Sequence, residues 1–134
     1  FKAVLERSNM RKIVKHLRAG DIVWYSPDQD FGRQQAVFAP FFGVNAATLT
    51  TTSRLAEMGK ANVVGGFHYR DPVTHQYRIV FKAVDTTLPT GDDVRDATIT
   101  NEMLEQAIRV EPAQYMWVHR RFKTRPEGEP SLYE

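Results

Sequence analysis

The sequence predicts an α/β fold in which helices flank a mixed sheet of parallel and antiparallel strands. Residues 8–19 have the apolar spacing of an amphipathic helix, and the apolar run that follows at residues 22–25 is typical of a buried strand in a sheet with a parallel component. Residues 61–69 and 76–84 are predicted to be two further strands that form an antiparallel hairpin. A chain of 134 residues is long enough for one domain with a sizeable core and too short for two.

The first predicted helix has recognisable ends. Ser8 or Asn9 can cap its start, and Gly20 suits the left-handed position at which helices commonly end. Its apolar face carries Met10, Ile13, Val14 and Leu17.

Between residues 27 and 59 the pattern predicts a loop, an extended segment and a second helix. Residues 27–32 form a loop at the carboxyl end of the first strand, and residues 37–44 are extended and rich in phenylalanine. Asn45 can cap a helix over residues 46–58, which Gly59 ends. Open α/β sheets bind ligands beyond the carboxyl ends of their strands, so the loop is the best position for a site.

The last third of the chain is predicted to contain one long helix. Asp71 begins the turn of the hairpin, and a polar linker over residues 86–95 leads to a helix that Pro112 stops. Residues 115–118 are expected to pack as a short helix or strand, and residues 123–134 to form an irregular tail. The apolar face of the helix carries Ile99, Met103, Ala107 and Val110.

Composition excludes several classes of protein. Hydrophobic residues make up 42% and charged residues 25%, as in soluble globular proteins, and no run approaches the roughly 18 apolar residues of a membrane-spanning helix. Without cysteine, the chain has no disulfide framework, thiolate nucleophile or cysteine-based zinc site. The net charge is only +2, but residues 119–125 contain Arg120, Arg121, Lys123 and Arg125. This basic cluster suits phosphates, acidic sugars or lipid headgroups, and a solvated tail explains it equally well.

Two carboxylates in the loop, Asp28 and Asp30, are candidate site residues. Residues two apart in an extended loop point to opposite sides, so the carboxylates are not automatically a pair. They could bind a metal ion, or accept hydrogen bonds from sugar hydroxyls or from backbone amides of a substrate loop. Turn chemistry explains them without any ligand, because Asp readily bonds its own backbone. Spacing alone leaves these alternatives open.

A second candidate group lies near the C-terminus. Trp117, His119 and Arg120 place an aromatic ring, a titratable group and a guanidinium within four residues, and guanidinium groups bind phosphate and carboxylate through two parallel bonds. The alternative is a helix terminus with a half-buried tryptophan and solvated cations.

Four segments carry a resemblance to a known family. They are Asn9-Met10-Arg11, IVWYSPDQDFG at residues 22–32, VFAPFFGV at residues 37–44, and QYMWVHRRFKTRPEGEPSLY at residues 114–133. Together they resemble the bacterial lipid A biosynthesis acyltransferases of the lauroyl, palmitoleoyl and myristoyl type. The likeness covers residues 7–133, and the last segment is its most specific part.

The resemblance implies an enzyme that transfers a fatty acyl chain from acyl carrier protein to a hydroxyacyl chain of the Kdo-lipid IVA precursor, at the cytoplasmic face of the bacterial inner membrane. It implies a sheet like that of glycerol-phosphate acyltransferases, of which residues 1–134 would be the C-terminal portion. The family's membrane anchor and catalytic His-acid motif would precede residue 8. We therefore expect no catalytic residue here, no activity of the chain alone, no cofactor or metal, and no nucleic-acid partner. Substrate contacts are expected at Arg11, Asp28, Gln29, Asp30, Trp117, His119, Arg120 and Arg121.

His16 and Asp21 match the spacing of the His-acid motif of glycerolipid acyltransferases, in which the acid orients a histidine that deprotonates the acceptor hydroxyl. Asp21 lies beyond Gly20, so the spacing does not imply that the two side chains meet. We expect a solvated helical histidine, because short patterns often arise by chance. The resemblance also aligns this pair with a helix-to-strand connection and not with the catalytic motif.

Two alternatives and one departure accompany the resemblance. The acceptor could be another glycolipid, such as a mannoside, or the basic tail could belong to a non-enzymatic module that binds polyanions or a membrane surface. Where similar proteins usually carry Pro after Val63 and Val64, this chain has Gly65 and Gly66. We expect this departure to alter the strand locally.

Overall fold

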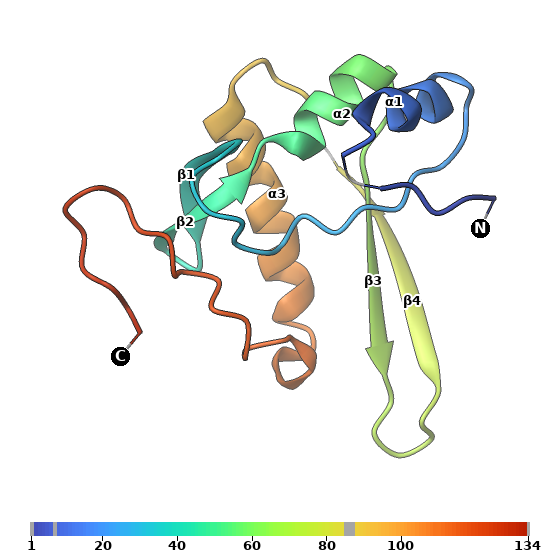
Figure 1. Cartoon of the computed structure of the whole chain (residues 1–134). Helices are drawn as coiled ribbons and strands as arrows, with labels where there is room; N and C mark the ends of the chain where they lie inside the picture. Colours follow the sequence, from blue (N-terminus) through green and yellow to red (C-terminus); the bar gives the residue numbers. More distant parts are fainter. Residues whose placement is uncertain (1, 7, 85–87, 134) are drawn as a thin grey trace.

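The structure is a computed structural model that describes residues 2–6, 8–84 and 88–133, and these residues form a small mixed α/β domain, as the sequence predicts. The helices are α1 (Met10–Arg18), α2 (Thr51–Gly59), α3 (Asp93–Ile108) and the short 3-10 helix η1 (Pro112–Gln114). The strands are β1 (Ala36–Phe41), β2 (Val44–Leu49), β3 (Val64–Arg70) and β4 (Tyr77–Ala83). α3 lies between a β1–β2 hairpin and a β3–β4 hairpin, and α1 and α2 lie together at one end (Figure 1).

α1 begins and ends where the sequence predicts. The side-chain oxygen of Asn9 accepts the backbone N–H of Lys12 at 3.3 Å, and Gly20 lies just beyond the helix with a φ of 83°. α1 packs on α2, and a Cβ added to Gly59 would lie 2.8 Å from the Cβ of Leu17. The absence of a side chain at Gly59 therefore lets the two helices approach closely.

The β1–β2 hairpin corrects the predicted start of the second helix. Phe42 and Gly43, both at positive φ, make the turn, and residues 46–49 belong to β2 rather than to a helix. Ala46 is fully buried beside Phe41 in the core. Pairing with β1 and burial therefore override the helical preference of alanine at these positions.

The β3–β4 hairpin confirms the predicted antiparallel pair, with Arg70 opposite Tyr77. In the turn, Asp71 Oδ1 accepts the N–H groups of Thr74 and Val73 at 2.7 and 2.8 Å, and these bonds lower the pKa of the Asp71 carboxyl. Turn chemistry thus determines where the hairpin reverses.

The two faces of this hairpin differ in what covers them. On one face, the Tyr69 hydroxyl donates to the Ala107 carbonyl of α3 at 3.0 Å. On the other face, Tyr77, Ile79 and Phe81 of β4 are 66%, 64% and 75% exposed. α3 therefore covers one side of the hairpin, while the other is an apolar surface.

α3 starts earlier than the sequence predicts. Asp92 caps the helix by accepting the N–H groups of Val94 and Arg95 at 2.9 and 3.1 Å, so residues 93–95 of the predicted linker are helical. Residues 86 and 87 of that linker lie outside the described residues.

The core lies between the β1–β2 hairpin, α3 and the segment that follows α3. Its buried part consists of Phe41, Ala46 and Ile108, and the half-buried residues around it are Phe42, Leu104, Tyr115 and Phe122. Tyr115 and Phe122 come from the last segment of the chain, so this segment completes the core although it has no long helix or strand.

Two predicted elements and the predicted parallel pairing are not found in the described residues. Residues 22–25 form no strand, and Ile22 is 99% and Trp24 76% exposed. Both sheets of the described residues are antiparallel. Residues 115–118 form no helix or strand either, and residues 116–118 are exposed. An apolar run becomes a buried strand only where another surface reaches it, and the described part of the chain brings no such surface to Ile22 and Trp24.

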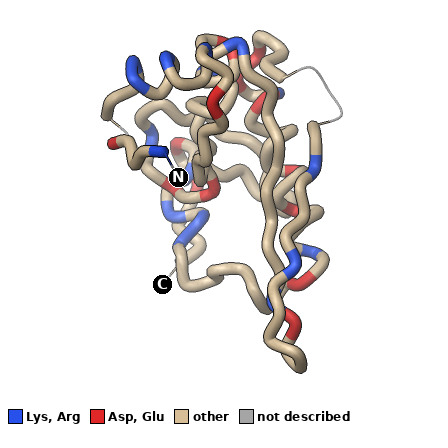
Figure 2. The backbone as a smooth tube through the Cα atoms, turned by 90° about the vertical axis from the view of Figure 1, so that its right-hand side faces the viewer, with Lys and Arg blue, Asp and Glu red and all other residues tan. Residues whose placement is uncertain are grey.

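Lys and Arg positions are spread along the backbone and interleaved with Asp and Glu positions (Figure 2). Within the described ranges, none of the helices is long and apolar enough to span a bilayer.

Candidate functional site

A buried carboxylate, Asp30, joins the loop at residues 27–32 to the C-terminal segment. Asp30 is 3% exposed; its Oδ1 accepts the Gly32 N–H at 2.8 Å and the Thr124 hydroxyl at 2.9 Å, and its Oδ2 accepts the Thr124 N–H at 2.8 Å. The bond to Gly32 is turn chemistry, and the bonds to Thr124 link two segments that are 94 residues apart. We call Asp30, His119, Arg121 and Thr124 the loop–tail cluster.

His119 binds the backbone of the same loop. Its Nε2 accepts the Asp30 N–H at 2.9 Å. A nitrogen that accepts an N–H carries no proton itself, so this bond requires a neutral imidazole with its proton on Nδ1. His119 is half-buried, and the Arg121 N–H donates to its backbone carbonyl at 2.8 Å. The cluster therefore fixes both the side chain and the main chain of Asp30.

Arg121 lies inside the molecule. It is 2% exposed; its Nη1 donates to the Ala47 carbonyl at 2.7 Å, its Nη2 donates to the Thr48 hydroxyl at 3.0 Å, and its guanidinium lies 5.2 Å from the centre of the Phe41 ring. Burial lowers the pKa of the guanidinium, and nearby Tyr115 opposes this shift. Arg121 thus holds the C-terminal segment against β2, and its head group faces the interior.

The other candidate residues surround the cluster at the surface. Gln29 is exposed, Asp28 is half-exposed, and Trp117 is 55% exposed. Arg120 is also exposed, and its guanidinium lies 5.6 Å from the centre of the Tyr133 ring. The structure therefore places a carboxylate, an amide, an indole and a guanidinium at the surface near one buried anchor.

Asp28 also acts on a neighbouring phenol. Its Oδ1 accepts the Ser26 hydroxyl at 3.2 Å. Burial, and then the Asp28 charge, raise the pKa of Tyr115 to about 12. The Tyr115 phenol therefore stays protonated to a higher pH than the phenol of an exposed tyrosine.

Arg11 lies apart from these residues. It is exposed near the start of α1, beside a shallow cavity that Glu6, Ser8 and Asn9 also line. In Figure 1, α1 lies at the end of the molecule opposite the C-terminal segment. The structure thus brings Asp30 and His119 into contact, buries Arg121 beside them, and leaves Arg11 at a separate place.

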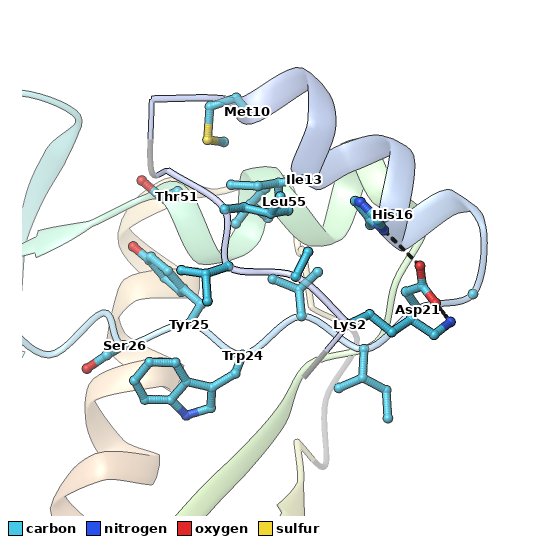
Figure 3. Close-up of a pocket in the computed structure, with 16 residues that line it drawn as sticks. Lys2, Met10, Ile13, His16, Asp21, Trp24, Tyr25, Ser26, Thr51 and Leu55 are labelled. Carbon is cyan, nitrogen blue, oxygen red and sulfur yellow. Dashed lines mark hydrogen bonds and ion pairs between the residues drawn. The ribbon is translucent and has the colours of Figure 1, made fainter.

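A second candidate feature is an apolar groove of about 830 Å³ (Figure 3). Ile13 of α1 and Leu55 of α2 line one side, and residues 2–5 and 20–26 line the other. Side chains that could hold a metal ion do not gather here or elsewhere in residues 2–6, 8–84 and 88–133. The groove therefore offers apolar surface rather than metal ligands.

The expectation that His16 and Asp21 stay apart is wrong. His16 Nδ1 and Asp21 Oδ2 are 2.8 Å apart, because the left-handed turn at Gly20 brings the chain back and the Asp21 N–H donates to the His16 carbonyl at 3.0 Å. The Lys2 ammonium binds the same carboxylate at 2.7 Å, and Lys2 and then His16 lower the pKa of Asp21. This ion-paired group anchors the chain where the groove-lining segment 22–26 begins.

Comparison with known proteins shows which family the chain is similar to. The sequence profile of the family described as "Bacterial lipid A biosynthesis acyltransferase" matches residues 1–124. The chain belongs to the bacterial lipid A biosynthesis acyltransferase family. Asp30, Asp28 and Gln29, together with Trp117 to Arg121, lie within the range that this family profile matches.

Individual members of the family resemble the chain over nearly its whole length. It is 41% identical over 133 residues to the lipid A biosynthesis lauroyltransferase of Escherichia coli (strain K12), which is 98% of this chain and 44% of that protein. It is 42% identical over 133 residues to the palmitoleoyltransferase of the same strain, at 98% and 43% coverage. Its identity to the myristoyltransferase is 33% over 125 residues, at 93% and 39% coverage. The chain therefore spans less than half the length of these acyltransferases.

Sequence reasoning missed two residues, one in the loop–tail cluster and one in the ion-paired group at Asp21. Thr124 closes the loop–tail cluster through its hydroxyl and its N–H, and Lys2 completes the ion-paired group at Asp21. A threonine within a basic, proline-containing tail has no local signal for such a role. Asp30 has a sequence signal in its loop position after an apolar run, but the sequence indicates neither its burial nor the groups that donate to it.

Proposed function

We propose that the protein containing this chain transfers a fatty acyl chain from acyl carrier protein to a hydroxyacyl chain of a Kdo-lipid IVA-type precursor of lipid A. The reaction takes place at the cytoplasmic face of the bacterial inner membrane, on a domain whose sheet resembles that of glycerol-phosphate acyltransferases. Membership of the lipid A acyltransferase family supports this proposal, as do relatives named for lauroyl, palmitoleoyl and myristoyl transfer. Residues 1–134 act as the C-terminal portion of that domain and contact the acceptor.

The loop–tail cluster is the structural feature that best supports a role of this chain in binding the acceptor. It holds the loop against the C-terminal segment, and the exposed residues Gln29, Trp117 and Arg120 are sequence neighbours of the buried or half-buried residues that make these bonds. A guanidinium suits a phosphate or carboxylate of the acceptor, and an indole suits a sugar ring or acyl chain.

In this proposal the eight candidate residues have two kinds of role. Asp30, His119 and Arg121 position the surface from inside. The groups that contact the acceptor are Asp28, Gln29, Trp117 and Arg120, with Arg11 making a separate contact from α1. The catalytic histidine and its acid lie outside residues 1–134, so we expect the purified 134-residue chain to transfer no labelled acyl group. Measurable transfer by that chain would contradict this assignment.

Mass spectrometry of lipid A tests the activity. A strain that lacks the complete protein should accumulate lipid A without one secondary acyl chain, and expression of the complete protein should restore that chain. An unchanged lipid A profile in the deletion strain would refute the proposed acceptor, provided that no second transferase in the strain performs the same step.

The Arg120→Ala variant of the complete protein tests the acceptor contact. Its KM for the acceptor should rise about three- to tenfold at low salt, because an exposed guanidinium contributes a charge-assisted bond that salt screens. The difference from wild type should shrink as the salt concentration rises. Arg95→Ala removes the same charge from an exposed position at the start of α3 and should leave KM unchanged. Equal effects of the two substitutions, or an effect independent of salt, would argue against a contact at Arg120.

A further inference from the structure

One long side of α1 is a basic surface. Lys12, Lys15 and Arg18 recur at every third position and are all exposed, so they form one stripe along the helix. Ile13 lies on the other side of the helix and is 8% exposed, and that side packs on α2. We call Lys12, Lys15 and Arg18 the cationic face. Because the apolar side of α1 is occupied by α2, the cationic face points away from the domain.

The positive charge of this face is not neutralised within the described part of the chain. α1 contains no acidic residue, and none of the three cations is ion-paired in residues 2–6, 8–84 and 88–133. Asp21, the first carboxylate after α1 in the sequence, already binds Lys2 and His16 at 2.7 and 2.8 Å. Like charges three positions apart on a helix repel one another, so an acidic partner would stabilise the face.

The cationic face lies away from the acceptor residues of the C-terminal segment. α1 is at one end of the molecule, and the segment that carries Trp117 and Arg120 is at the other (Figure 1). A transferase must hold a donor and an acceptor at the same time, so a charged surface that is separate from Trp117 and Arg120 is available to the donor. Arg11, at the start of α1, keeps the acceptor contact proposed above and is left out of the cationic face.

We propose that the cationic face binds an acidic surface of the acyl carrier protein that delivers the acyl chain. The inference rests on the proposed function, in which a carrier protein is the donor. Opposite charges on the two proteins speed their encounter and orient the carrier. A contact made by exposed charges is also weak enough for the carrier to leave after transfer.

A carrier protein fits this face better than an anionic membrane does. Helices that lie in a membrane interface bury an apolar face among the lipids, whereas the apolar side of α1 packs on α2. None of the large apolar side chains of α1 is exposed, so the helix has nothing to insert beside its cations. A folded protein surface can match three positioned cations with three carboxylates, and this match gives specificity.

Binding of fluorescently labelled lauroyl-acyl carrier protein to the complete protein in detergent tests the contact. Lys12→Glu should raise the Kd about fivefold at low salt, and the double variant Lys12→Glu/Lys15→Glu about 20-fold, because reversed charges repel an acidic partner. Both differences should shrink as the salt concentration rises. A Kd of the double variant within about twofold of the wild-type value at low salt would overturn the proposal.

Arg95→Glu is the matched control for Lys12→Glu. Both residues are exposed, and each lies three positions after the N-cap of its helix, with its N–H bonded to the side chain of that cap. A carboxylate is favourable in the first turn of a helix, so neither substitution should disturb folding. Arg95→Glu should leave the Kd for the carrier unchanged, and a rise equal to that of Lys12→Glu would show that net charge rather than the cationic face attracts the carrier.

Thiol labelling in nanodiscs separates the carrier from a membrane surface. This chain has no cysteine, so Lys15→Cys can be made in the complete protein after any cysteines elsewhere are replaced by serine. The thiol of this variant should react equally fast with a maleimide in discs with and without phosphatidylglycerol, and lauroyl-acyl carrier protein should slow the reaction. Protection by phosphatidylglycerol without the carrier would overturn the proposal in favour of a membrane contact.

Transfer of the lauroyl chain, measured on the same proteins, tests the proposed function separately. A wild-type protein that binds the carrier through the cationic face but transfers no acyl chain would refute the proposed activity and leave the binding surface in place. Transfer by the wild type and the double variant with the same KM for the carrier would refute the binding surface and leave the activity in place.

Discussion

Asp30 shows how one side chain can order a loop that has no regular secondary structure. Its carboxylate accepts three hydrogen bonds, one from its own turn and two from Thr124, while its N–H binds His119. A carboxylate has room for about four donors, so Asp30 is nearly saturated by the protein itself. Of the alternatives open from the sequence, the structure gives Asp30 turn chemistry through Gly32, and its bonds to Thr124 of the same chain are not among those alternatives.

The Asp30→Asn substitution should destabilise the protein by about 1–3 kcal/mol, because the amide replaces one acceptor oxygen by a donor that faces other donors. The effect should be visible as a lower urea midpoint of unfolding. Asp28→Asn is the matched control, since Asp28 is half-exposed and its carboxylate accepts the Ser26 hydroxyl. Its midpoint should stay close to that of the wild type. Comparable midpoints for the two variants would mean that the bonds to Thr124 contribute little.

Arg121 and Arg120 are neighbours in the sequence with opposite surroundings. Arg121 is 2% exposed and donates to the Ala47 carbonyl and the Thr48 hydroxyl, whereas Arg120 is at the surface. A basic cluster in a sequence does not indicate which of its cations face solvent. Of the four cations in residues 119–125, Arg121 is therefore a poor choice for a salt-sensitive ligand contact and Arg120 a good one.

At the scale of elements, the β3–β4 hairpin meets α3 through a glycine. A Cβ added to Gly65 would lie 2.7 Å from the Met103 sulfur and 2.8 Å from a ring carbon of Phe67. A Cβ added to Gly66, on the opposite face, would lie 3.5 Å from Phe81, which is ordinary contact. The departure from the family pattern at these two positions thus has a packing explanation at Gly65 and none at Gly66.

Gly65→Ala should therefore destabilise the protein by about 1–2 kcal/mol, because the new methyl forces neighbouring side chains away from close contact. Gly66→Ala should be neutral or stabilising by up to about 1 kcal/mol, since glycine weakens a strand and this face has space. Thermal or urea unfolding of the two variants measures the difference. A Gly66→Ala variant that is the less stable of the two would show that the hairpin packs differently in solution.

Elements whose signals are local could be predicted from the sequence. Asn9 and Gly20 bound α1, and Asp71 marks the turn of the β3–β4 hairpin, because each acts on backbone groups within a few residues. The local pattern predicts a helix over residues 46–49, but they form a strand because their pairing with β1 and their burial decide their conformation. The apolar run that contains Ile22 and Trp24 predicts a buried strand. Burial of such a run requires another part of the protein to pack on it, and the local sequence pattern does not show which part does so.

At the scale of the whole molecule, the candidate site depends on contacts that join the two ends of the chain. The sequence identified Asp30 and His119 separately, and only the fold shows that they touch. It also identified His16 and Asp21 as a chance match, although Gly20 turns them toward each other. Contacts across many residues follow from tertiary packing, so their partners cannot be read from spacing.

Truncations of the complete protein test whether the C-terminal segment orders the loop. Ending the chain after Lys123 removes Thr124, which binds Asp30, and should make residues 26–34 the first site of limited proteolysis. Ending it after Gly128 retains Thr124 and removes Tyr133, whose hydroxyl accepts the Phe122 N–H, so the loop should stay protected. Equal cleavage rates in both truncated forms would show that Thr124 does not protect the loop.

The distance along the chain between Asp30 and Thr124 has a consequence for biosynthesis. A ribosome must add 94 further residues after Asp30 before the two donors that complete its hydrogen bonding exist. Until then the nascent loop carries a carboxylate that water must solvate, and the surface with Gln29 and Trp117 cannot be fixed. The surface that we propose contacts the acceptor therefore forms only after Thr124 has been made. A ribosome that stops before that residue should release a polypeptide whose earlier elements can form but whose loop stays open.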